Sequence, residues 1–405
     1  MALPHMATGI FAAATLVLTG ATPAMAAGPL ACGAVITADT TLTADLVGCA
    51  GDGLVVSGSE VTLDLAGHSI GGDRSEETAD IGITVLASAG VTIRGGSVDG
   101  FDRGIVLDGS PAGLVTAMHV HDNSRRGIVL LGGSDDGRVV DNVSEDNGAS
   151  AMAIVESDGA VVTGNRNQRN LGGAGVRLEG ASHAAVSHNV LNGNQFGMQI
   201  AGADDNQVSD NLMRADVESA VSVEFSVGNV VTGNRMLSCG SGIILESSDR
   251  TTITDNQILH SVGQDGIGVQ IYGNDNLVAR NTVIDSVRYG IEVDDFQDEG
   301  HSPVTGNVLR DNVVNGAGEG IAIGPEAGGV VLGTLVEHNT VSNALDDGIQ
   351  LLGPSTGLET STVRRNVAVH NGGLGIAAVP GTVDGGGNHA AGNGNPLQCL
   401  NISCR

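Results

Sequence analysis

Short runs of alternating apolar and polar residues, separated by Gly, Asn, Asp and Ser, recur along most of the chain. One run follows a Gly-Ile-x-Leu start, for example Gly104-Ile105-Val106-Leu107. A second run carries a Val-Thr-x-Asn mark, for example Val231-Thr232-Gly233-Asn234, and a third run follows that Asn. Alternation with a period of two between turn residues predicts β-strands, and no window carries the 3.6-residue apolar period of a helix. The pattern therefore predicts an all-β protein built from short strands.

The three-run unit repeats about every 21 to 25 residues from Gly82 to Gly290, and every 27 to 30 residues after that. The clearest starts share a Gly before Ile, Val or Met, and they are Gly82, Gly104, Gly127, Gly175, Gly197, Gly242, Gly266, Gly290, Gly320, Gly348 and Gly375. Three strands in so short a unit predict a parallel β-helix, whose coils stack at about 4.8 Å. We expect a single-stranded, right-handed solenoid of about thirteen coils. A leucine-rich horseshoe needs a Leu-rich consensus, which this chain lacks.

Each Val-Thr-x-Asn mark places an Asn at the same point of its coil, which predicts a column of asparagines. The members are Asn142, Asn165, Asn189, Asn211, Asn234, Asn256, Asn281, Asn312, Asn339 and Asn366. A turn Asn tolerates left-handed backbone geometry, and its amide can bond the Asn of the next coil. A second column of small or polar residues lies five residues later and holds Asn147, Asn170, Asn194, Asp216, Cys239, Ser261 and Ser286. Cys239 is therefore interpreted as a structural residue.

Residues 1–26 have the pattern of a signal peptide. The stretch from Thr8 to Met25 is apolar or small, and Ala24-Met25-Ala26 is an A-x-A cleavage site. The residues before it contain no Lys or Arg, which is unusual for such a segment. We expect cleavage near Ala27 and a secreted mature protein. Because no later run of 18 apolar residues occurs, we expect no membrane association after cleavage.

The cysteines fit an exported repeat protein whose two ends need closing. Two of them lie near the start of the mature chain and two at its end, so we expect the disulfides Cys32–Cys49 and Cys399–Cys404, with Cys239 free. We expect three segments in the mature chain, which are an N-terminal cap (27–52), the β-helix (53–393) and a C-terminal cap (394–405).

Charge narrows the range of partners. The chain has 46 acidic and 18 basic residues, all of the basic ones Arg, for a net charge of −28. This charge balance argues against binding to nucleic acid or to an anionic membrane, since both require clustered Lys and Arg. A polyanionic sugar would need a bridging cation. Aromatic residues are only 2 % of the chain, so the core must be aliphatic.

Strand alternation points two positions of each Gly-Ile-x-Leu-x run away from the core. In most coils these positions are small or apolar, whereas in the central coils they are polar. The second outward position gives Glu179, Ala201, Glu224, Glu246, Gln270 and Asp294 in successive coils. The first outward position adds Arg177, Gln199, Ser222 and Glu292. We therefore expect a mainly acidic stripe on the outer face of one sheet.

Glu224 and Glu246 should lie one coil apart, at about 5 Å. Two carboxylates at this distance repel, so that one takes up a proton or a cation binds between them. In an enzyme, Glu246 would be the general acid, and Glu224 or Asp294 would be the partner carboxylate. In a calcium site, the same three side chains would be the ligands. A solvated acidic stripe with neither role is the alternative.

The longest coil follows this stripe. Residues 294–303 extend one turn and include His301, and the only two tyrosines of the chain lie nearby. The candidates for substrate binding are Gln270, Glu292, Tyr272, Tyr289, His301, Arg177 and Glu179. His119 and His121 are a second candidate for metal binding, because they face the same side of a strand, but the sequence shows no third ligand.

The Gly-Ile-x-Leu start, the Val-Thr-x-Asn mark and the A-x-A signal resemble those of secreted bacterial right-handed parallel β-helix repeat proteins. That group is similar to pectate lyases, polygalacturonases, alginate epimerases and NosD-type carbohydrate-binding repeats. The resemblance covers roughly Gly53 to Asn393 and rests on scaffold residues, so it is specific for the fold and not for an activity. The Asp-Pro-His motif of alginate epimerases and the Gly-His-Gly and Arg-Ile-Lys motifs of polygalacturonases are missing, and a Lys base is excluded.

The resemblance and the acidic stripe together imply two functions. The first is an enzyme that hydrolyses or cleaves by elimination an extracellular polysaccharide, and the clustered acids favour it. The second is a non-catalytic carbohydrate-binding or structural surface protein, which the absence of Trp favours, since Trp is the strongest stacking residue for sugars.

Overall fold

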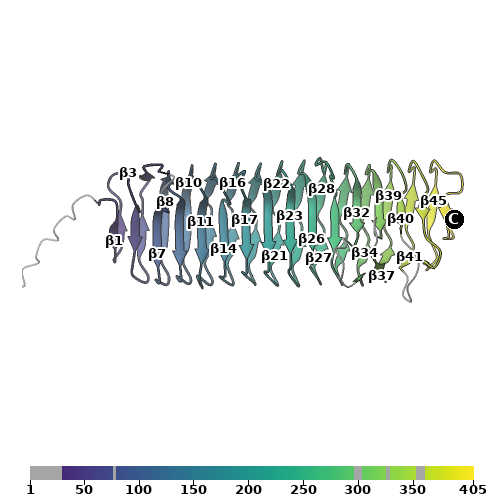
Figure 1. Ribbon diagram of the computed structural model, residues 1–405, viewed down its shortest axis with the longest axis horizontal. Helices are drawn as coiled ribbons and strands as arrows, with labels where there is room; N and C mark the ends of the chain where they lie inside the picture. The colour runs from purple at the N-terminus through teal and green to yellow at the C-terminus, as the bar shows by residue number, and fades with distance from the viewer. Residues whose placement is uncertain (1–29, 76–78, 296–302, 325–328, 353–360) are drawn as a thin grey trace, which may run out of the picture.

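The computed structural model describes residues 30–75, 79–295, 303–324, 329–352 and 361–405, and within them it contains strands but no helix. The chain forms one elongated, right-handed parallel β-helix that runs from the N-terminal to the C-terminal end along a single axis (Figure 1). The predicted fold class is confirmed. The described part of the chain includes no helix long and apolar enough to cross a membrane.

Three parallel sheets run the length of the stack. The first sheet consists of β1 (Ala34–Ile36), β4 (Leu54–Val56), β7 (Ile81–Leu86), β9 (Arg103–Asp108), β11 (Arg126–Leu131), β14 (Met152–Val155), β17 (Ala174–Glu179), β20 (Phe196–Ala201), β23 (Ser219–Glu224), β26 (Ser241–Glu246), β29 (Val269–Tyr272), β32 (Tyr289–Val293), β36 (Glu319–Ile323), β40 (Ile349–Leu351), β43 (Ile376–Ala377) and β46 (Cys399–Leu400).

The second sheet consists of β2 (Thr40–Thr41), β5 (Thr62–Asp64), the first halves of β8 (Thr92–Asp99) and β10 (Leu114–His121), β12 (Arg138–Val140), β15 (Val161–Thr163), β18 (Ala185–Ser187), β21 (Gln207–Ser209), β24 (Val230–Thr232), β27 (Thr252–Thr254), β30 (Leu277–Ala279), β34 (Val308–Arg310), β38 (Leu335–Glu337), β41 (Thr362–Arg364) and β44 (Val383–Asp384).

The third sheet consists of β3 (Leu46–Cys49), β6 (Ser69–Gly72), the second halves of β8 and β10, β13 (Val143–Glu145), β16 (Arg166–Gln168), β19 (Val190–Asn192), β22 (Leu212–Arg214), β25 (Arg235–Leu237), β28 (Gln257–Leu259), β31 (Thr282–Ile284), β35 (Val313–Asn315), β39 (Thr340–Ser342), β42 (Val367–Val369) and β45 (His389–Ala391). A separate pair, β33 (Val304–Thr305) and β37 (Val331–Leu332), lies outside these sheets.

The stack is longer than the thirteen coils that the sequence predicted, since 16 strands of the described chain pair in the first sheet. The extra rungs come from the two ends. At the N-terminus β1 pairs with β4, and at the C-terminus β46 pairs with β43. Terminal segments that pair in this way cover the open ends of the solenoid core.

Inward-facing aliphatic residues form continuous columns through the core. In the first sheet, Val223, Leu245, Ile271 and Val293 pair in successive coils, and all four are fully buried. The Gly that opens each unit has a steric cause. A Cβ atom at Gly242 would collide with the carbonyl oxygen of the following coil, so this position must be Gly if the coils are to stack at strand spacing.

The asparagine column forms as expected. The amide of Asn234 shows the pattern: its backbone N and its Nδ2 both donate to Oδ1 of Asn256, at 2.9 and 3.1 Å, and Nδ2 also donates to the carbonyl of Val208 at 2.9 Å. The asparagines themselves do not adopt the left-handed geometry that a turn Asn tolerates. The residue before each one has the positive φ, for example 66° at Gly233 and 59° at Asp255. That preceding residue forms the turn between the second and third strands of the coil, which points the Asn side chain into the interior of the β-helix.

Replacement of Asn234 by Ala is expected to lower the free energy of unfolding by about 1–3 kcal/mol, because the partners of a buried amide lose their bonds. The side chain is 1 % exposed and lies in mid-column. Thermal or denaturant unfolding measures the change. The control is Asn192→Ala, since Asn192 is half-buried at the end of β19 and outside both columns. Equal stability of the two variants would contradict a stabilising role for the asparagine column.

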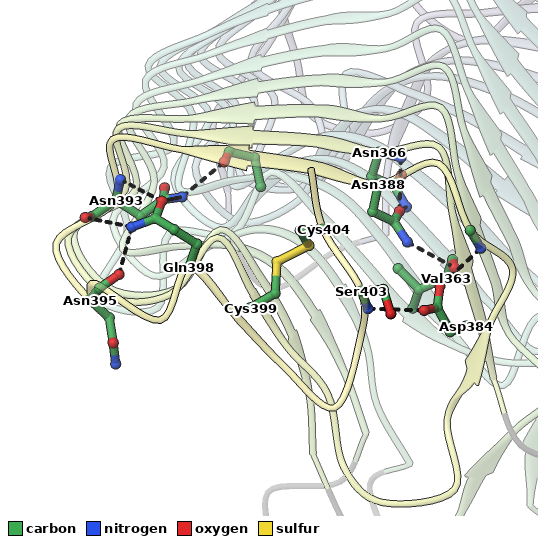
Figure 2. Close-up of a disulfide and its surroundings, with 12 residues drawn as sticks. Val363, Asn366, Asp384, Asn388, Asn393, Asn395, Gln398, Cys399, Ser403 and Cys404 are labelled. Carbon is green, nitrogen blue, oxygen red and sulfur yellow. Dashed lines mark hydrogen bonds between the residues drawn. A yellow bond between two sulfur atoms is a disulfide. The ribbon is translucent and has the colours of Figure 1, made fainter.

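Both predicted disulfides, Cys32–Cys49 and Cys399–Cys404, are present, and Cys239 is free and buried. Figure 2 shows the C-terminal bridge beside the end of the amide columns. There Asn393 donates to Oε1 of Gln398 at 2.9 Å, and Ser403 N donates to Asp384 at 2.9 Å. Gln398 thus satisfies the last amide of its column. The predicted signal peptide, residues 1–26, lies outside the described residues.

Candidate functional site

The outer face of the first sheet carries the polar stripe, but with a different register from the one expected. Glu224 pairs with Glu246, and Glu246 pairs with Tyr272 rather than with Gln270. Gln270 lies in the other row, between Ile244 and Glu292.

The placement of Gln270 beside Glu246 was wrong because Gly266-Ile267 imitates the start of a unit. The strand begins two residues later, where Val269 pairs with Ile243. A unit start at Gly266 would also have turned Ile267 into the core, which is wrong for the same reason. Ile267 instead packs with Tyr289 and Ala322 in a cluster separate from the main core.

A groove of about 850 Å³ crosses the sheet at this point. The residues that line it come from both edges and from the sheet face, and they are Val217, Glu218, Phe225, Gly240, Ser241, Ile244, Glu246, Ser247, Gly263, Gln264, Asp265, Ile267, Gln270, Tyr272 and Arg288. Three of the predicted site residues, Glu246, Gln270 and Tyr272, therefore share one groove. Glu224 occupies the rung next to Glu246, just beyond the lining.

Glu246 is the carboxyl of the groove lining that borders Glu224. Partial desolvation and the neighbouring charge of Glu224 raise the pKa of Glu246 above its usual value. Among the described residues, none forms a hydrogen bond or an ion pair with the side-chain carboxyl of Glu246. Glu224 differs, because its Oε1 accepts bonds from Gln199 Nε2 at 2.8 Å and from Ser222 Oγ at 2.9 Å. The two adjacent carboxyls thus have distinct environments.

Arg177 and Glu179 lie outside the groove, on β17, two coils before Glu224. Arg177 Nε donates to Glu179 at 3.1 Å, and its Nη1 donates to Gln199 at 2.7 Å. Since Gln199 in turn donates to Glu224, Arg177 reaches the acidic pair through a hydrogen-bond chain and not by direct contact. Arg177 therefore helps to hold Glu224 in position through Gln199.

The other end of the stripe is buried. Glu292 and Asp294 are 4 and 7 % exposed, and neither lines the groove. Gln270 Nε2 joins Glu292 to the site, because it donates to Tyr272 Oη at 2.5 Å and to Glu292 Oε2 at 2.7 Å. Burial, followed by the charges of Glu292 and Asp294, raises the pKa of Tyr272, so its phenol stays protonated.

Tyr289 is buried under Arg288, whose guanidinium lies 4.8 Å from the ring centre. Arg288 also pairs with Asp265 at 3.7 Å, which fixes one wall of the groove. Tyr289 thus supports the wall from below. His301 and most of the other residues of the predicted long turn at 294–303 lie outside the described residues.

Phe225 is a groove residue that the sequence reasoning missed. It follows Glu224 directly, lines the groove, and its side chain is 71 % exposed. A Phe directly after the outward strand position, where the two preceding coils carry Gly180 and Gly202, in a chain with 2 % aromatic residues, was the signal that could have pointed to it.

The fold and this groove define the class: a parallel β-helix with a polar groove across one outer sheet face. The profile of the family described as "Periplasmic copper-binding protein (NosD)" matches residues 32–212, 145–288 and 263–382. These overlapping matches span most of the chain, and the protein belongs to the NosD family. A comparison with curated proteins finds no significant match.

Several solved structures share the general fold. DFA-IIIase from Arthrobacter chlorophenolicus A6, in complex with GF2, is 17 % identical, with a TM-score of 0.46 over 61 % of this chain and 71 % of that one. The A-module of the Azotobacter vinelandii mannuronan C-5 epimerase AlgE6 is 14 % identical, with a TM-score of 0.48 over 84 and 91 % of the two chains. A point mutant of the periplasmic alginate epimerase AlgG is 13 % identical, with a TM-score of 0.46 over 73 and 78 %. At such identities the likeness does not extend to chemistry.

A copper site of this chain would need converging imidazole or sulfur ligands. In the described ranges, no three His, Cys, Asp or Glu side chains are grouped so as to hold a metal ion. His119 Nε2 bonds Glu145 at 2.8 Å, His121 Nδ1 bonds Asp122 at 2.9 Å, and the thiol of Cys239 is buried. These donors do not fit copper, and the described residues supply no third ligand to the two histidines, the second candidate for metal binding.

Proposed function

We propose that this protein is exported and acts on an extracellular polysaccharide that lies in the groove around Glu246. The observation that carries the proposal is the Glu224–Glu246 pair, in which one carboxyl has a raised pKa and the other accepts two hydrogen bonds. Adjacent acids whose environments differ are the usual basis of separate acid and base roles. The family description as periplasmic and the two disulfides support export.

In this function Glu246 is the general acid. A raised pKa keeps the carboxyl partly protonated closer to neutral pH, so it can protonate the oxygen of the leaving sugar. Glu224 is the partner carboxylate, held by Gln199 and Ser222. Rungs of a parallel sheet lie about 4.8 Å apart, near the 5–5.5 Å that separates the two carboxyls of retaining glycosidases.

Gln270 and Tyr272 are the substrate-binding groups of the proposed site. Both line the groove and each carries a polar group suited to a sugar hydroxyl. Asp294, the other predicted partner, lies two rungs from Glu246 with Tyr272 between them and is buried. We therefore prefer Glu224 as the partner carboxylate.

A second candidate is a calcium-dependent sugar-binding protein without catalysis. Desolvation, and after it repulsion from Glu224, raises the pKa of Glu246, and a Ca²⁺ ion between the two carboxyls would relieve that repulsion. Asp294 is separated from this pair, so the ion would need backbone, water or sugar oxygens to complete its shell.

A screen of polysaccharides with the purified protein tests the proposal. New reducing ends without ultraviolet absorbance indicate hydrolysis, and absorbance of an unsaturated sugar indicates elimination. Binding that is lost on addition of a chelator, with neither product, indicates the calcium-dependent binder. A protein that neither binds nor cleaves any polysaccharide contradicts both candidates.

A further inference from the structure

Phe225 occupies a backbone position that does not suit it. It is one member of a column of turn residues that follow the outward strand position in successive coils. The column consists of Ala87, Gly109, Gly132, Glu156, Gly180, Gly202, Phe225 and Ser247, all with φ between 44 and 63°. Half of its members are Gly, as expected for left-handed geometry. Phe225 is the bulkiest, with φ of 50°, and a bulky side chain is strained there.

Nothing in the core offsets that strain, because the ring is mostly exposed. A strained residue with an exposed apolar side chain is not selected by folding, and such residues concentrate at binding sites. Only the coil of Phe225 places an aromatic ring in this column, and that coil borders the groove beside Glu246.

The groove around the ring combines an apolar surface with negative charge. Its apolar lining includes Ile244, from β26, and Val217, from the turn before β23. Its charged lining residues are Glu218, Glu246 and Asp265 against Arg288, and Arg288 is already paired with Asp265. An acidic polysaccharide would be repelled here. An uncharged sugar would not, and the C–H face of its ring packs well on an aromatic ring.

We propose that Phe225 is a platform on which an uncharged sugar ring of the polysaccharide stacks, next to Glu246. The inference rests on the proposed function and adds a substrate class and a binding residue to it. Because the fold favours Gly at this position, Phe225→Gly removes the ring without a structural cost. A loss of sugar binding by Phe225→Gly can therefore be measured without a loss of stability.

The experiment starts with an array of neutral glucans, mannans, xylans and fructans and of acidic polyuronates. The tightest oligosaccharide is then titrated into the wild-type protein and its variants. The chain has no Trp and two Tyr, of which Tyr272 lines the groove, so tyrosine fluorescence reports occupancy directly. Phe225→Tyr tests rescue by another ring. Leu171→Ala, at a residue 66 % exposed and outside the groove, is the matched control.

We expect the wild-type protein to bind a neutral glycan and Phe225→Gly to bind it at least about tenfold more weakly. Phe225→Tyr and Leu171→Ala should bind it nearly as well as the wild type. The melting temperature of Phe225→Gly should not be lowered. Equal binding by wild type and Phe225→Gly overturns the platform and leaves the proposed function standing. Binding of polyuronates alone overturns the substrate class. A wild-type protein that binds no glycan overturns this inference together with the proposed function.

Discussion

Replacement of Glu246 by Gln is expected to lower the turnover of the polysaccharide by about 10²–10⁴-fold, the usual contribution of a general acid. Gln has nearly the same shape and cannot donate the proton, so affinity for the sugar should change little. The raised pKa of Glu246 also predicts the shape of the pH profile. A general acid must be protonated, so kcat/KM should fall as pH rises through that pKa, and the variant should lack this descending limb.

The control for this experiment is Glu156→Gln. Glu156 is an exposed acid of the turn that follows β14, outside the groove, so the substitution removes the same charge without touching the site. Turnover by Glu246→Gln at the level of this control would show that Glu246 has no part in proton transfer.

The second large effect concerns stability. Asp216→Asn is expected to stabilise the protein at pH 8 by on the order of 4 kcal/mol and to have little effect near pH 4. Burial in the second polar column raises the pKa of Asp216 to about 7, against two bonds donated by Asn194 that lower it. A difference of about three pKa units from the ordinary value of 3.8 corresponds to roughly 4 kcal/mol.

The direction of this pH dependence follows from the number of protons that the folded and unfolded states bind. Between pH 4 and pH 7 the unfolded chain has lost the proton of Asp216 and the folded chain retains it, so stability falls as pH rises through this window. Above pH 7 both states have lost this proton, and stability falls no further on account of Asp216. The nearest titratable neighbour is Cys239, whose Sγ lies 3.8 Å from Asp216 Oδ2. Burial, followed by the charge of Asp216, raises the pKa of that thiol to about 12, so it stays neutral across this window.

An Asn at position 216 removes the buried charge and continues the amide column. Its Oδ1 would accept from Asn194 as Asp216 does, and by register its Nδ2 would reach the carbonyl of Leu191. Melting temperatures of both proteins from pH 4 to pH 8 measure the effect. Parallel curves, with no divergence above pH 5, would show that Asp216 is not buried as a neutral acid. Cys239→Ser serves as a control that changes the column without removing the carboxyl.

The fold could be predicted because stacking imposes the same requirement on every coil. Gly242 must leave room for the next backbone, Leu245 must fill the core, and Asn256 must bond the amides of the neighbouring coils, so each signal is repeated many times. The site is not repeated. The pair Glu224–Glu246 could be found, since no insertion separates these two coils and strand alternation sets their side.

The rest of the site depends on features that the repeat pattern does not encode. The turn before β29 carries extra residues, and Gly266-Ile267 within it imitates a unit start, so Gln270 was assigned to the wrong row. The burial of Glu292 and the exposure of Phe225 follow from how neighbouring coils are covered, which alternation alone does not give. The pKa of Asp216 likewise depends on its burial in the stack.

The most direct test of the groove as the carbohydrate site is a crystal structure of the Glu246→Gln variant with an oligosaccharide from the polysaccharide it binds. The account predicts the sugar in the groove, with one ring against Phe225, hydroxyls bonded to Gln270 or Tyr272, and a glycosidic oxygen beside position 246. A sugar bound on another face of the β-helix, with the groove around position 246 holding only solvent, would contradict it.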